Sequence, residues 1–410
     1  MQWYREMNKT ERRTFIGAFG GWAIDALDFM VFTFVISTLI SLWGIEKGQA
    51  GMLGTVTLLF SAIGGWLAGI LADRYGRVRI LQITILWFSA CTVAIGFAQN
   101  FEQLLILRAL QGLGFGGEWA VGSVLMGEIV RAQHRGKAVG TVQSGWAVGW
   151  GAAAILYTIA FSVLPPPEWA WRTLFWIGVA PAFLVIYIRK HVPEPEVFQR
   201  ARAQAQSSAE RPSFWKIFSP SLLKTTMVTA LLCTGVQGGY YAITTWLPTF
   251  LKTERQLSVL GTGGYLMVII VGSFCGYIAG AYSADKLGRR ANLLIFSVLS
   301  ALTVYVYTLV PLSNDAMLVL GFPLGFAASG IFSGIGAYLT ELFPTDVRAN
   351  GQGFAYNFGR GIGALFPSLV GFLSQTHGLG WAIGAFATGA YAIVIVTALL
   401  LPETKGKVLS

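Results

Sequence analysis

Twelve long apolar runs, separated by short polar segments, follow one another along the chain. A helix needs about 20 predominantly apolar residues to cross the hydrocarbon core of a bilayer. The runs span residues 15–41, 51–72, 80–98, 103–126, 138–160, 170–188, 223–250, 260–284, 291–311, 316–340, 351–373 and 380–400. We therefore predict an all-α polytopic membrane protein with twelve transmembrane helices. A count with one span lost or merged with its neighbour is the alternative.

Composition excludes two classes of soluble protein. Apolar residues make up 54% of the 410 residues and charged residues 12%, whereas a soluble domain carries roughly 25% charged residues. So few charges cannot cover the surface of a soluble enzyme or of a nucleic-acid-binding protein of this length. The 50 glycines are typical of closely packed membrane helices.

Motifs for cofactor or metal chemistry are not found in the sequence. It contains no Gly-x-x-x-x-Gly-Lys-Ser/Thr loop, so direct use of ATP is not expected. The three histidines are scattered among loops, which argues against a metal site. No polar segment is long enough to fold as a catalytic domain, so the chain is not expected to be an enzyme and no organic or metal cofactor is predicted.

The basic residues are concentrated in alternate connections between the apolar runs. If the N-terminus is cytoplasmic, the cytoplasmic segments hold 23 of the 29 lysines and arginines, counting Lys224 at the cytoplasmic edge of the seventh run. The connections on the other side hold Lys47, Lys252 and Arg255. This asymmetry obeys the positive-inside rule and predicts that both termini are cytoplasmic. The net charge of +10 thus reflects orientation in a lipid bilayer and not a nucleic-acid partner.

The second half of the chain repeats three features of the first half. The sequence Asp-Arg-Tyr-Gly-Arg at residues 73–77 returns as Asp-Lys-Leu-Gly-Arg at residues 285–289. A Glu and an Arg seven residues apart occur as Glu128/Arg135 and again as Glu341/Arg348. A Pro-Glu step follows both the sixth and the twelfth run. The nearly constant offset between these features predicts two six-helix bundles that descend from one unit.

These features define the expected organisation of the chain. The predicted segments are a cytoplasmic N-terminus at 1–14, an N-terminal six-helix bundle at 15–188, a cytoplasmic central loop at 189–222, a C-terminal six-helix bundle at 223–400 and a cytoplasmic tail at 401–410.

The doubled loop sequence, the Glu–Arg pairs and the Pro-Glu-Thr-Lys-Gly tail at 402–406 resemble the major facilitator superfamily, on its sugar-porter-like, metabolite-symporter side. Four further stretches resemble its sialate:proton symporter group, which includes sialic acid and lactate carriers. They are Trp3-Tyr4-Arg5, Asp25-Ala-Leu-Asp28-Phe29, Gly116-Gly117-Glu118-Trp119 and Tyr356-Asn357-Phe358-Gly359-Arg360. The aromatic-acid:proton symporters are a close neighbour, with an acidic first span and an arginine in span 11. The resemblance implies a multi-pass protein of the bacterial inner membrane that works by alternating access, and we expect a monomer.

A gating role for the charged loop residues is implied by the resemblance. In such carriers a network of this kind holds the cytoplasmic side shut and breaks when that side opens. The residues concerned are Asp73, Arg77, Glu128, Arg135, Asp285, Arg289, Glu341 and Arg348. The alternative is ordinary juxtamembrane charge that follows the positive-inside rule.

Three acids lie inside predicted spans, where an unpaired charge costs several kcal/mol. Asp25 and Asp28 are three residues apart near the middle of the first span, and Glu118 is in the fourth. Two carboxylates so close repel each other, so one of them is expected to hold a proton. We predict that these acids are candidates for proton coupling. A structural ion pair with Arg108 or another arginine is the alternative, and Arg108 itself is expected to snorkel or to be structural.

Arg360 is the leading candidate to bind an anionic substrate, because its planar guanidinium matches a carboxylate at two points. Asn357 and Tyr356 lie three and four residues before it, on the same helical face. Further candidate ligands are Gln237 and Tyr241 in span 7 and Gln143 in span 5. The alternative is that Arg360 only neutralises Asp25 or Asp28.

These observations predict a secondary active transporter that carries a small organic monocarboxylate together with a proton. Its partners would be the organic anion, protons and the bilayer. A sugar or polyol facilitator of the same superfamily is the first alternative, disfavoured by the buried acids and Arg360. A non-transporting sensor on the same scaffold is the second, and its usual mark, a long extra cytoplasmic domain, is not found in this sequence.

Overall fold

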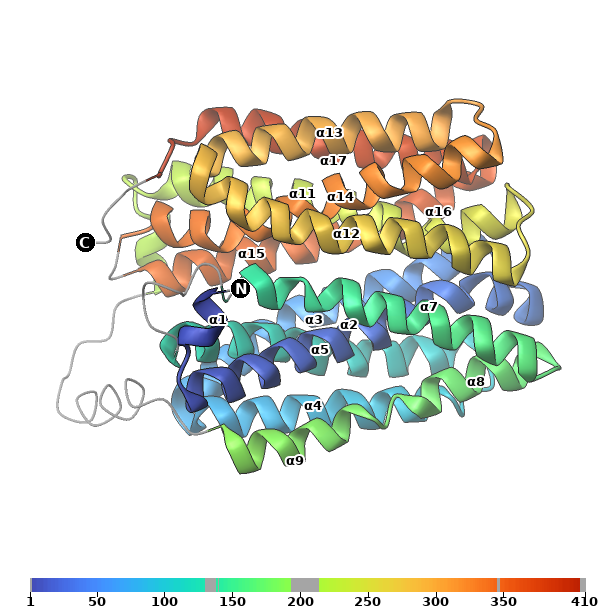
Figure 1. Cartoon of the computed structure of the whole chain (residues 1–410), viewed down its shortest axis with the longest axis horizontal. Coiled ribbons are helices and arrows are strands. Elements are labelled where there is room, and N and C mark those ends of the chain that lie inside the picture. Colours follow the sequence, from blue (N-terminus) through green and yellow to red (C-terminus); the bar gives the residue numbers. More distant parts are fainter. Residues whose placement is uncertain (1, 130–137, 139, 193–213, 345–346, 406–410) are drawn as a thin grey trace.

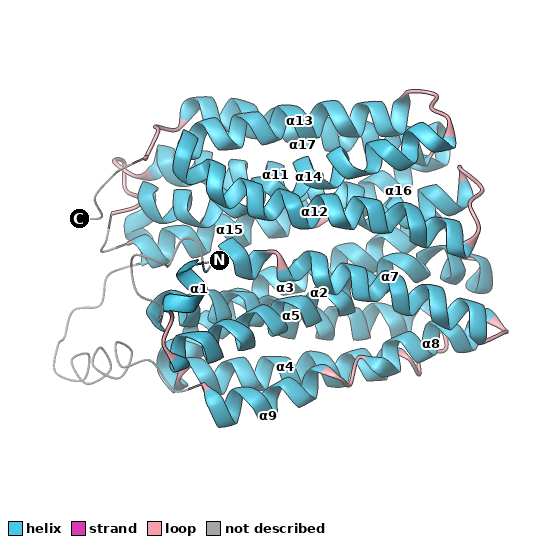
Figure 2. Cartoon of the chain, in the orientation of Figure 1, coloured by secondary structure: helices cyan, strands magenta, loops and turns pink. Residues whose placement is uncertain are grey.

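The computed structural model describes residues 2–129, 138, 140–192, 214–344 and 347–405. Within these residues the secondary structure is helical and contains no strand (Figure 2). The helices form two bundles that lie side by side, one from each half of the chain (Figure 1). Both chain ends lie on one face, here called the termini face, which also carries the turns after Tyr75 and Leu287. The opposite face is called the far face.

The N-terminal bundle is built from the first half of the chain. Its helices are α1 (Gln2–Glu6), α2 (Lys9–Trp43), α3 (Lys47–Tyr75), α4 (Arg77–Ile95), α5 (Phe101–Ile129), α7 (Gly145–Val163), α8 (Pro167–Ile177) and α9 (Pro181–His191). The C-terminal bundle comprises the 3-10 helix η1 (Phe214–Phe218), α11 (Leu223–Thr253), α12 (Val259–Leu287), α13 (Arg289–Leu309), α14 (Asn314–Leu342), α15 (Arg348–Gly363), α16 (Leu365–His377) and α17 (Leu379–Leu400).

Each of the twelve predicted spans coincides with a helix or with a pair of consecutive helices, α8 with α9 and α15 with α16. Eight helices in the described part of the chain are long and apolar enough on their own to cross a membrane. The break after α15 follows from Pro367, whose ring clashes with the carbonyl four residues earlier, at Gly363. The twelve-helix fold in two bundles is therefore confirmed.

The first predicted span, at residues 15–41, corresponds to helix α2, which begins earlier than predicted, at Lys9. Asn8 caps it by accepting a hydrogen bond from the backbone N–H of Glu11 at 2.9 Å, and the Glu11 carboxylate accepts from the N–H of Asn8 at 2.8 Å. This reciprocal capping box satisfies the free N–H groups of the first turn. The polar segment before the apolar run therefore continues the helix towards the termini face.

The internal repeat is visible in how helices pack within each bundle. A Cβ added at Gly116 of α5 would lie 1.7 Å from the carbonyl oxygen of Ser61 on α3. In the repeat-related pair, a Cβ at Gly325 of α14 would lie 1.9 Å from the carbonyl oxygen of Ile269 on α12. Only glycine permits such close backbone contact, so both bundles use the same device to join their second and fourth spans.

Four pairs of helices join the two bundles: α3 with α16, α3 with α15, α7 with α12, and α2 with α11. Towards the far face the first pair is in close contact. A Cβ at Gly51 of α3 would lie 2.5 Å from the carbonyl oxygen of Pro367, and one at Gly48 would lie 2.3 Å from the Phe372 ring. The surface between the bundles is thus tightly packed at its far end, and the predicted binding residues lie further along it.

Candidate transport site

Arg360 on α15 is 1% exposed and lies between the two bundles. Its Nη1 donates to the hydroxyl of Ser61 on α3 at 2.9 Å, and its Nε donates to Oε1 of Gln237 on α11 at 3.4 Å. Gln237 in turn donates from Nε2 to the backbone carbonyl of Tyr356 at 2.9 Å. The hydroxyls of Tyr241 and Tyr356 also lie within hydrogen-bonding range of the guanidinium. Three other predicted substrate-binding residues, Gln237, Tyr241 and Tyr356, are therefore gathered around the buried cation of Arg360.

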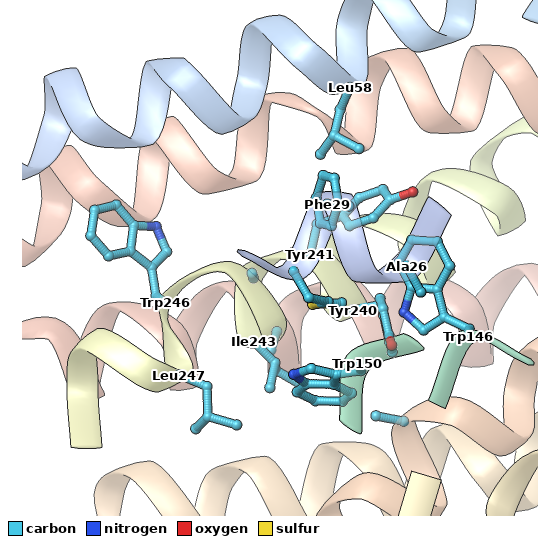
Figure 3. Close-up of a cluster of buried hydrophobic side chains, with 14 of the residues drawn as sticks. Ala26, Phe29, Leu58, Trp146, Trp150, Tyr240, Tyr241, Ile243, Trp246 and Leu247 are labelled. Carbon is cyan, nitrogen blue, oxygen red and sulfur yellow. The ribbon is translucent and has the colours of Figure 1, made fainter. Parts of the chain in front are cut away.

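Aromatic rings cover this cation from the N-terminal bundle. The Arg360 guanidinium lies 5.6 Å from the ring centre of Phe115. Phe115 stacks on Phe29 at 5.6 Å, and Phe29 lies 5.9 Å from both Trp146 and Tyr241. Figure 3 shows Phe29, Trp146 and Tyr241 converging from α2, α7 and α11. The arrangement places flat apolar surfaces beside a positive charge, which suits an organic anion with an unsaturated body.

The two acids of the first span have different surroundings. Asp25 is fully buried and lies within electrostatic range of Arg360. Asp28 is 4% exposed, and its Oδ2 accepts a hydrogen bond from the Thr92 hydroxyl on α4 at 2.9 Å. Asp25 is thus associated with the surface between the bundles, and Asp28 with the interior of the N-terminal bundle.

Arg108 on α5 is fully buried, which rules out snorkelling and leaves the structural role that was the other half of the expectation. Its Nη1 donates to Oε1 of Gln111 at 2.7 Å, and Gln111 donates from Nε2 to the hydroxyl of Thr92 at 2.7 Å. The guanidinium lies 4.0 Å from the ring centre of Phe32 and interacts electrostatically with Asp28. The physical reason is that Asp28 and Gln111 provide polar partners inside the bundle, so the side chain does not need to reach the membrane surface.

The structure gives no contact with Arg360 for the remaining predicted binding and coupling residues that it describes. Asn357 donates from its amide to the carbonyl of Gly353 in its own helix at 3.0 Å and faces Gly65 of α3. Gln143 is half-buried just before α7. The backbone of Glu118 belongs to α5, but its side chain lies outside the described residues.

Two of the predicted gating residues pair with each other within the C-terminal bundle. Arg289 at the start of α13 and Glu341 at the end of α14 form a salt bridge of 3.0 Å. Thr404 from the tail donates its hydroxyl to the same Glu341 carboxylate at 2.5 Å. Side chains of Asp73, Arg77, Glu128, Asp285 and Arg348, and all of Arg135, lie outside the described residues. The observed pair therefore joins two helices and the tail of a single bundle.

The tail residue Glu403 was part of the repeat pattern but had no predicted role. Its carboxylate accepts from the backbone N–H groups of Arg289 at 2.8 Å and Arg290 at 3.0 Å, and from those of Thr404 and Lys405. Burial by itself raises the pKa of Glu403, but these backbone hydrogen bonds outweigh it and hold the pKa below its usual value. Glu403 thus caps the N-terminus of α13.

Sequence reasoning missed Ser61, Phe29 and Phe115. Phe29 directly follows the acidic motif, and Phe115 directly precedes the Gly-Gly-Glu motif. Adjacency to those motifs was the available signal. Ser61 carried none, because a serine in an apolar run is ordinary in a membrane helix.

Known proteins that resemble this chain are membrane transporters. The chain is 45% identical over 98% of its length, and 93% of the relative's, to a probable 4-methylmuconolactone transporter of Cupriavidus pinatubonensis. It is 31% identical over 96% of its length, and 95% of the relative's, to the cis,cis-muconate transport protein of Acinetobacter baylyi. The sialic acid transporter NanX of Escherichia coli is more distant, at 27% identity over 96% of this chain and 95% of NanX.

Among solved structures, the proton:xylose symporter XylE superposes with a TM-score of 0.76 over 98% of both chains. At 18% identity this likeness concerns the fold alone. The family model of the Major Facilitator Superfamily matches residues 18–364 and 278–409. The chain therefore belongs to the Major Facilitator Superfamily, whose members are membrane transporters and not enzymes.

Proposed function

We propose that this protein is a proton-coupled symporter that carries a small organic carboxylate across the membrane by alternating access. The observation that carries the proposal is the buried guanidinium of Arg360 between the two bundles. A charge at this depth is costly unless it has a task or a partner. Substrate sites of transporters built from repeats lie near the midplane, where the repeats meet.

The substrate we favour is an unsaturated monocarboxylate. Muconolactone and muconate, the compounds named for two relatives, share a carboxylate and a carbon–carbon double bond conjugated with a carbonyl group, and muconate carries a second carboxylate. A carboxylate matches the fork of Arg360, and the rings of Phe29, Phe115 and Trp146 offer flat surfaces to an unsaturated body. Lactate and sialate share the carboxylate but not the conjugated body, and we rank them lower.

Proton coupling is supported by a count of hydrogens at Thr92. Its hydroxyl accepts from Gln111 at 2.7 Å and lies 2.9 Å from two acceptors, Oδ2 of Asp28 and the carbonyl of Phe88. One hydroxyl hydrogen serves only one of these acceptors. If Asp28 is protonated, it donates to Thr92 and Thr92 donates to Phe88, so every contact is a hydrogen bond. We therefore assign the transported proton to Asp28, with Asp25 and Glu118 as the other candidates.

The orientation we propose follows from the charges of the connections. The basic residues are concentrated at the termini face, so that face is cytoplasmic and the substrate enters from the far face during uptake. A reporter fused to the C-terminus, active only in the cytoplasm, is expected to be active.

The decisive experiment is uptake by the purified protein in reconstituted vesicles. Labelled 4-methylmuconolactone, cis,cis-muconate, lactate, sialate and xylose are offered with and without an inward pH gradient. We expect accumulation of at least one unsaturated carboxylate, dependent on the gradient and abolished by a protonophore. Gradient-independent equilibration of xylose with no carboxylate uptake would instead support the sugar facilitator.

A further inference from the structure

Ser61 lies on α3 of the N-terminal bundle and is fully buried. Its hydroxyl accepts the 2.9 Å hydrogen bond from Nη1 of Arg360, which belongs to the C-terminal bundle. The two residues are 299 positions apart in sequence. This hydrogen bond ties the candidate substrate anchor directly to the opposite half of the carrier.

The position of Ser61 is fixed by its neighbours. A Cβ at Gly116 would lie 1.7 Å from the Ser61 carbonyl oxygen, so α3 and α5 are already in backbone contact at this level. On the other side, a Cβ at Gly361 would lie 3.7 Å from Ala62, an ordinary contact. Ser61 is thus held firmly in its own bundle, while the chain beside Arg360 has room. When the bundles move apart, it is the hydrogen bond to Arg360 that must break.

A hydroxyl is a modest partner for a guanidinium. The Ser61 hydroxyl offers one neutral acceptor, whereas a carboxylate carries the opposite charge and can engage two N–H groups of an arginine together. A substrate carboxylate at Arg360 would therefore displace a weaker acceptor. In the empty carrier, however, a buried guanidinium still needs acceptors, because leaving its N–H groups unsatisfied is costly.

We propose that Ser61 is the resting partner of Arg360, which satisfies the guanidinium in the empty carrier and yields its hydrogen bond to the incoming substrate carboxylate. This rests on the proposed function of Arg360. Ser61 is then a positioning residue with two opposing effects. It weakens substrate binding by competition, and it stabilises the empty carrier during its return across the membrane.

The adjacent hydrogen bonds between the bundles show what is special about this one. Ser368 of α16 donates its hydroxyl to Thr55 of α3 at 2.8 Å, and Gln375 donates to Glu46 at 3.0 Å, nearer the far face. Neither of these contacts involves the substrate anchor. Ser368 is therefore a control serine that also hydrogen-bonds between α3 and the C-terminal bundle, but only to a neutral hydroxyl.

The test compares Ser61→Ala with Ser368→Ala in reconstituted vesicles, using labelled 4-methylmuconolactone as the probe. Two modes are measured. Counterflow exchange requires only the loaded carrier to move, whereas net uptake also requires the empty carrier to return. For Ser61→Ala we expect the half-saturation concentration for exchange to fall about tenfold, the equivalent of one hydrogen bond to a charged group. Net uptake should fall relative to exchange, and Ser368→Ala should change neither ratio.

Ser61→Thr retains the hydroxyl and should restore the wild-type ratio of net uptake to exchange. Folded protein is quantified for each variant by size-exclusion chromatography, and rates are expressed per folded molecule. An unchanged or increased half-saturation concentration in folded Ser61→Ala overturns the inference. If Arg360→Ala abolishes binding while Ser61→Ala behaves like wild type, the anchor role of Arg360 stands and only the role of Ser61 is lost. Normal substrate binding by Arg360→Ala would contradict both the anchor role of Arg360 and the role of Ser61.

Discussion

Two arginines in the described part of the chain are fully buried in similar local surroundings, but their partners lie in different places. Arg108 and Arg360 are 0% and 1% exposed, and each lies beside a phenylalanine ring, Phe32 or Phe115. All contacts described above for Arg108 are within the N-terminal bundle. Arg360, in contrast, contacts both bundles. Burial of a charge alone therefore does not identify a transport site, whereas partners on two bodies that move relative to each other do.

The largest effect that this comparison predicts is loss of transport on removing the arginine between the bundles. Arg360→Ala should give folded protein without saturable substrate binding. Arg360→Lys keeps the charge but loses the planar fork. We expect its affinity to fall about 10–150-fold, which corresponds to the loss of one charge-assisted hydrogen bond. Equilibrium binding of labelled 4-methylmuconolactone to purified protein measures both, and unaltered binding by Arg360→Ala would remove the distinction between the two arginines.

Arg108→Ala should instead act on stability. It leaves the buried Oε1 of Gln111 without the Nη1–H donor at 2.7 Å. Whenever Asp28 is deprotonated, it also leaves that carboxylate without the nearby positive charge, and breaking a buried ion pair costs about 3–5 kcal/mol. Thermal unfolding of the detergent-solubilised protein should show a markedly lower midpoint. Adding Asp28→Asn to this variant removes the remaining charge and should recover part of the loss. A variant with normal stability and no transport would place Arg108 in the transport machinery as well.

Much more of the fold than of the difference between Arg108 and Arg360 could be predicted from the sequence. Twelve apolar runs and a doubled loop motif fix the number of spans and the repeat, because length and hydrophobicity alone decide whether a helix crosses a bilayer. The break at Pro367 could also be read from the chain. Arg360, Tyr356, Gln237 and Tyr241 were each predicted as substrate-binding residues, and helical spacing placed Tyr356 on the same face as Arg360.

What the sequence could not show is which helix each polar side chain meets. Asp25 and Asp28 are three residues apart, yet one is close to Arg360 and the other to Thr92. Helical periodicity places them on one side of α2, but that side meets two neighbours. Ser61 was invisible for the same reason, since its importance comes from a residue in the other half of the chain.

The next largest effect concerns coupling and separates these two acids. Asp28→Asn mimics the protonated carboxyl, so this variant should still exchange substrate by counterflow. It should no longer accumulate substrate in response to a pH gradient, because no proton moves with it. Asp25→Asn and Glu118→Gln, the controls, should retain gradient-driven accumulation in the protein that folds. Accumulation by Asp28→Asn together with its loss in Asp25→Asn would move the proton role to the surface between the bundles.

The smallest effect is expected at the edge of the C-terminal bundle, where the ionic contacts of Arg289, Glu341 and the tail stay within one body. Because the pKa of Glu403 is lowered by its backbone hydrogen bonds, its carboxylate stabilises the folded state above the ordinary glutamate pKa near 4.3. That stabilisation disappears as the pH falls through the lowered pKa of the folded protein. Glu403→Gln should therefore cost on the order of 1 kcal/mol at pH 7, as for loss of a helix cap, and almost nothing once Glu403 is protonated.

The measurement is the thermal unfolding midpoint of wild type and Glu403→Gln as the pH is lowered from 7 towards 3. The two midpoints should converge with decreasing pH, and exchange per folded molecule should be the same for both proteins at pH 7. Glu341→Gln serves as a matched change on the partner of Arg289. If Glu403→Gln slowed exchange without lowering the midpoint, the tail would act in the transport cycle, and contacts confined to one bundle would not be merely stabilising.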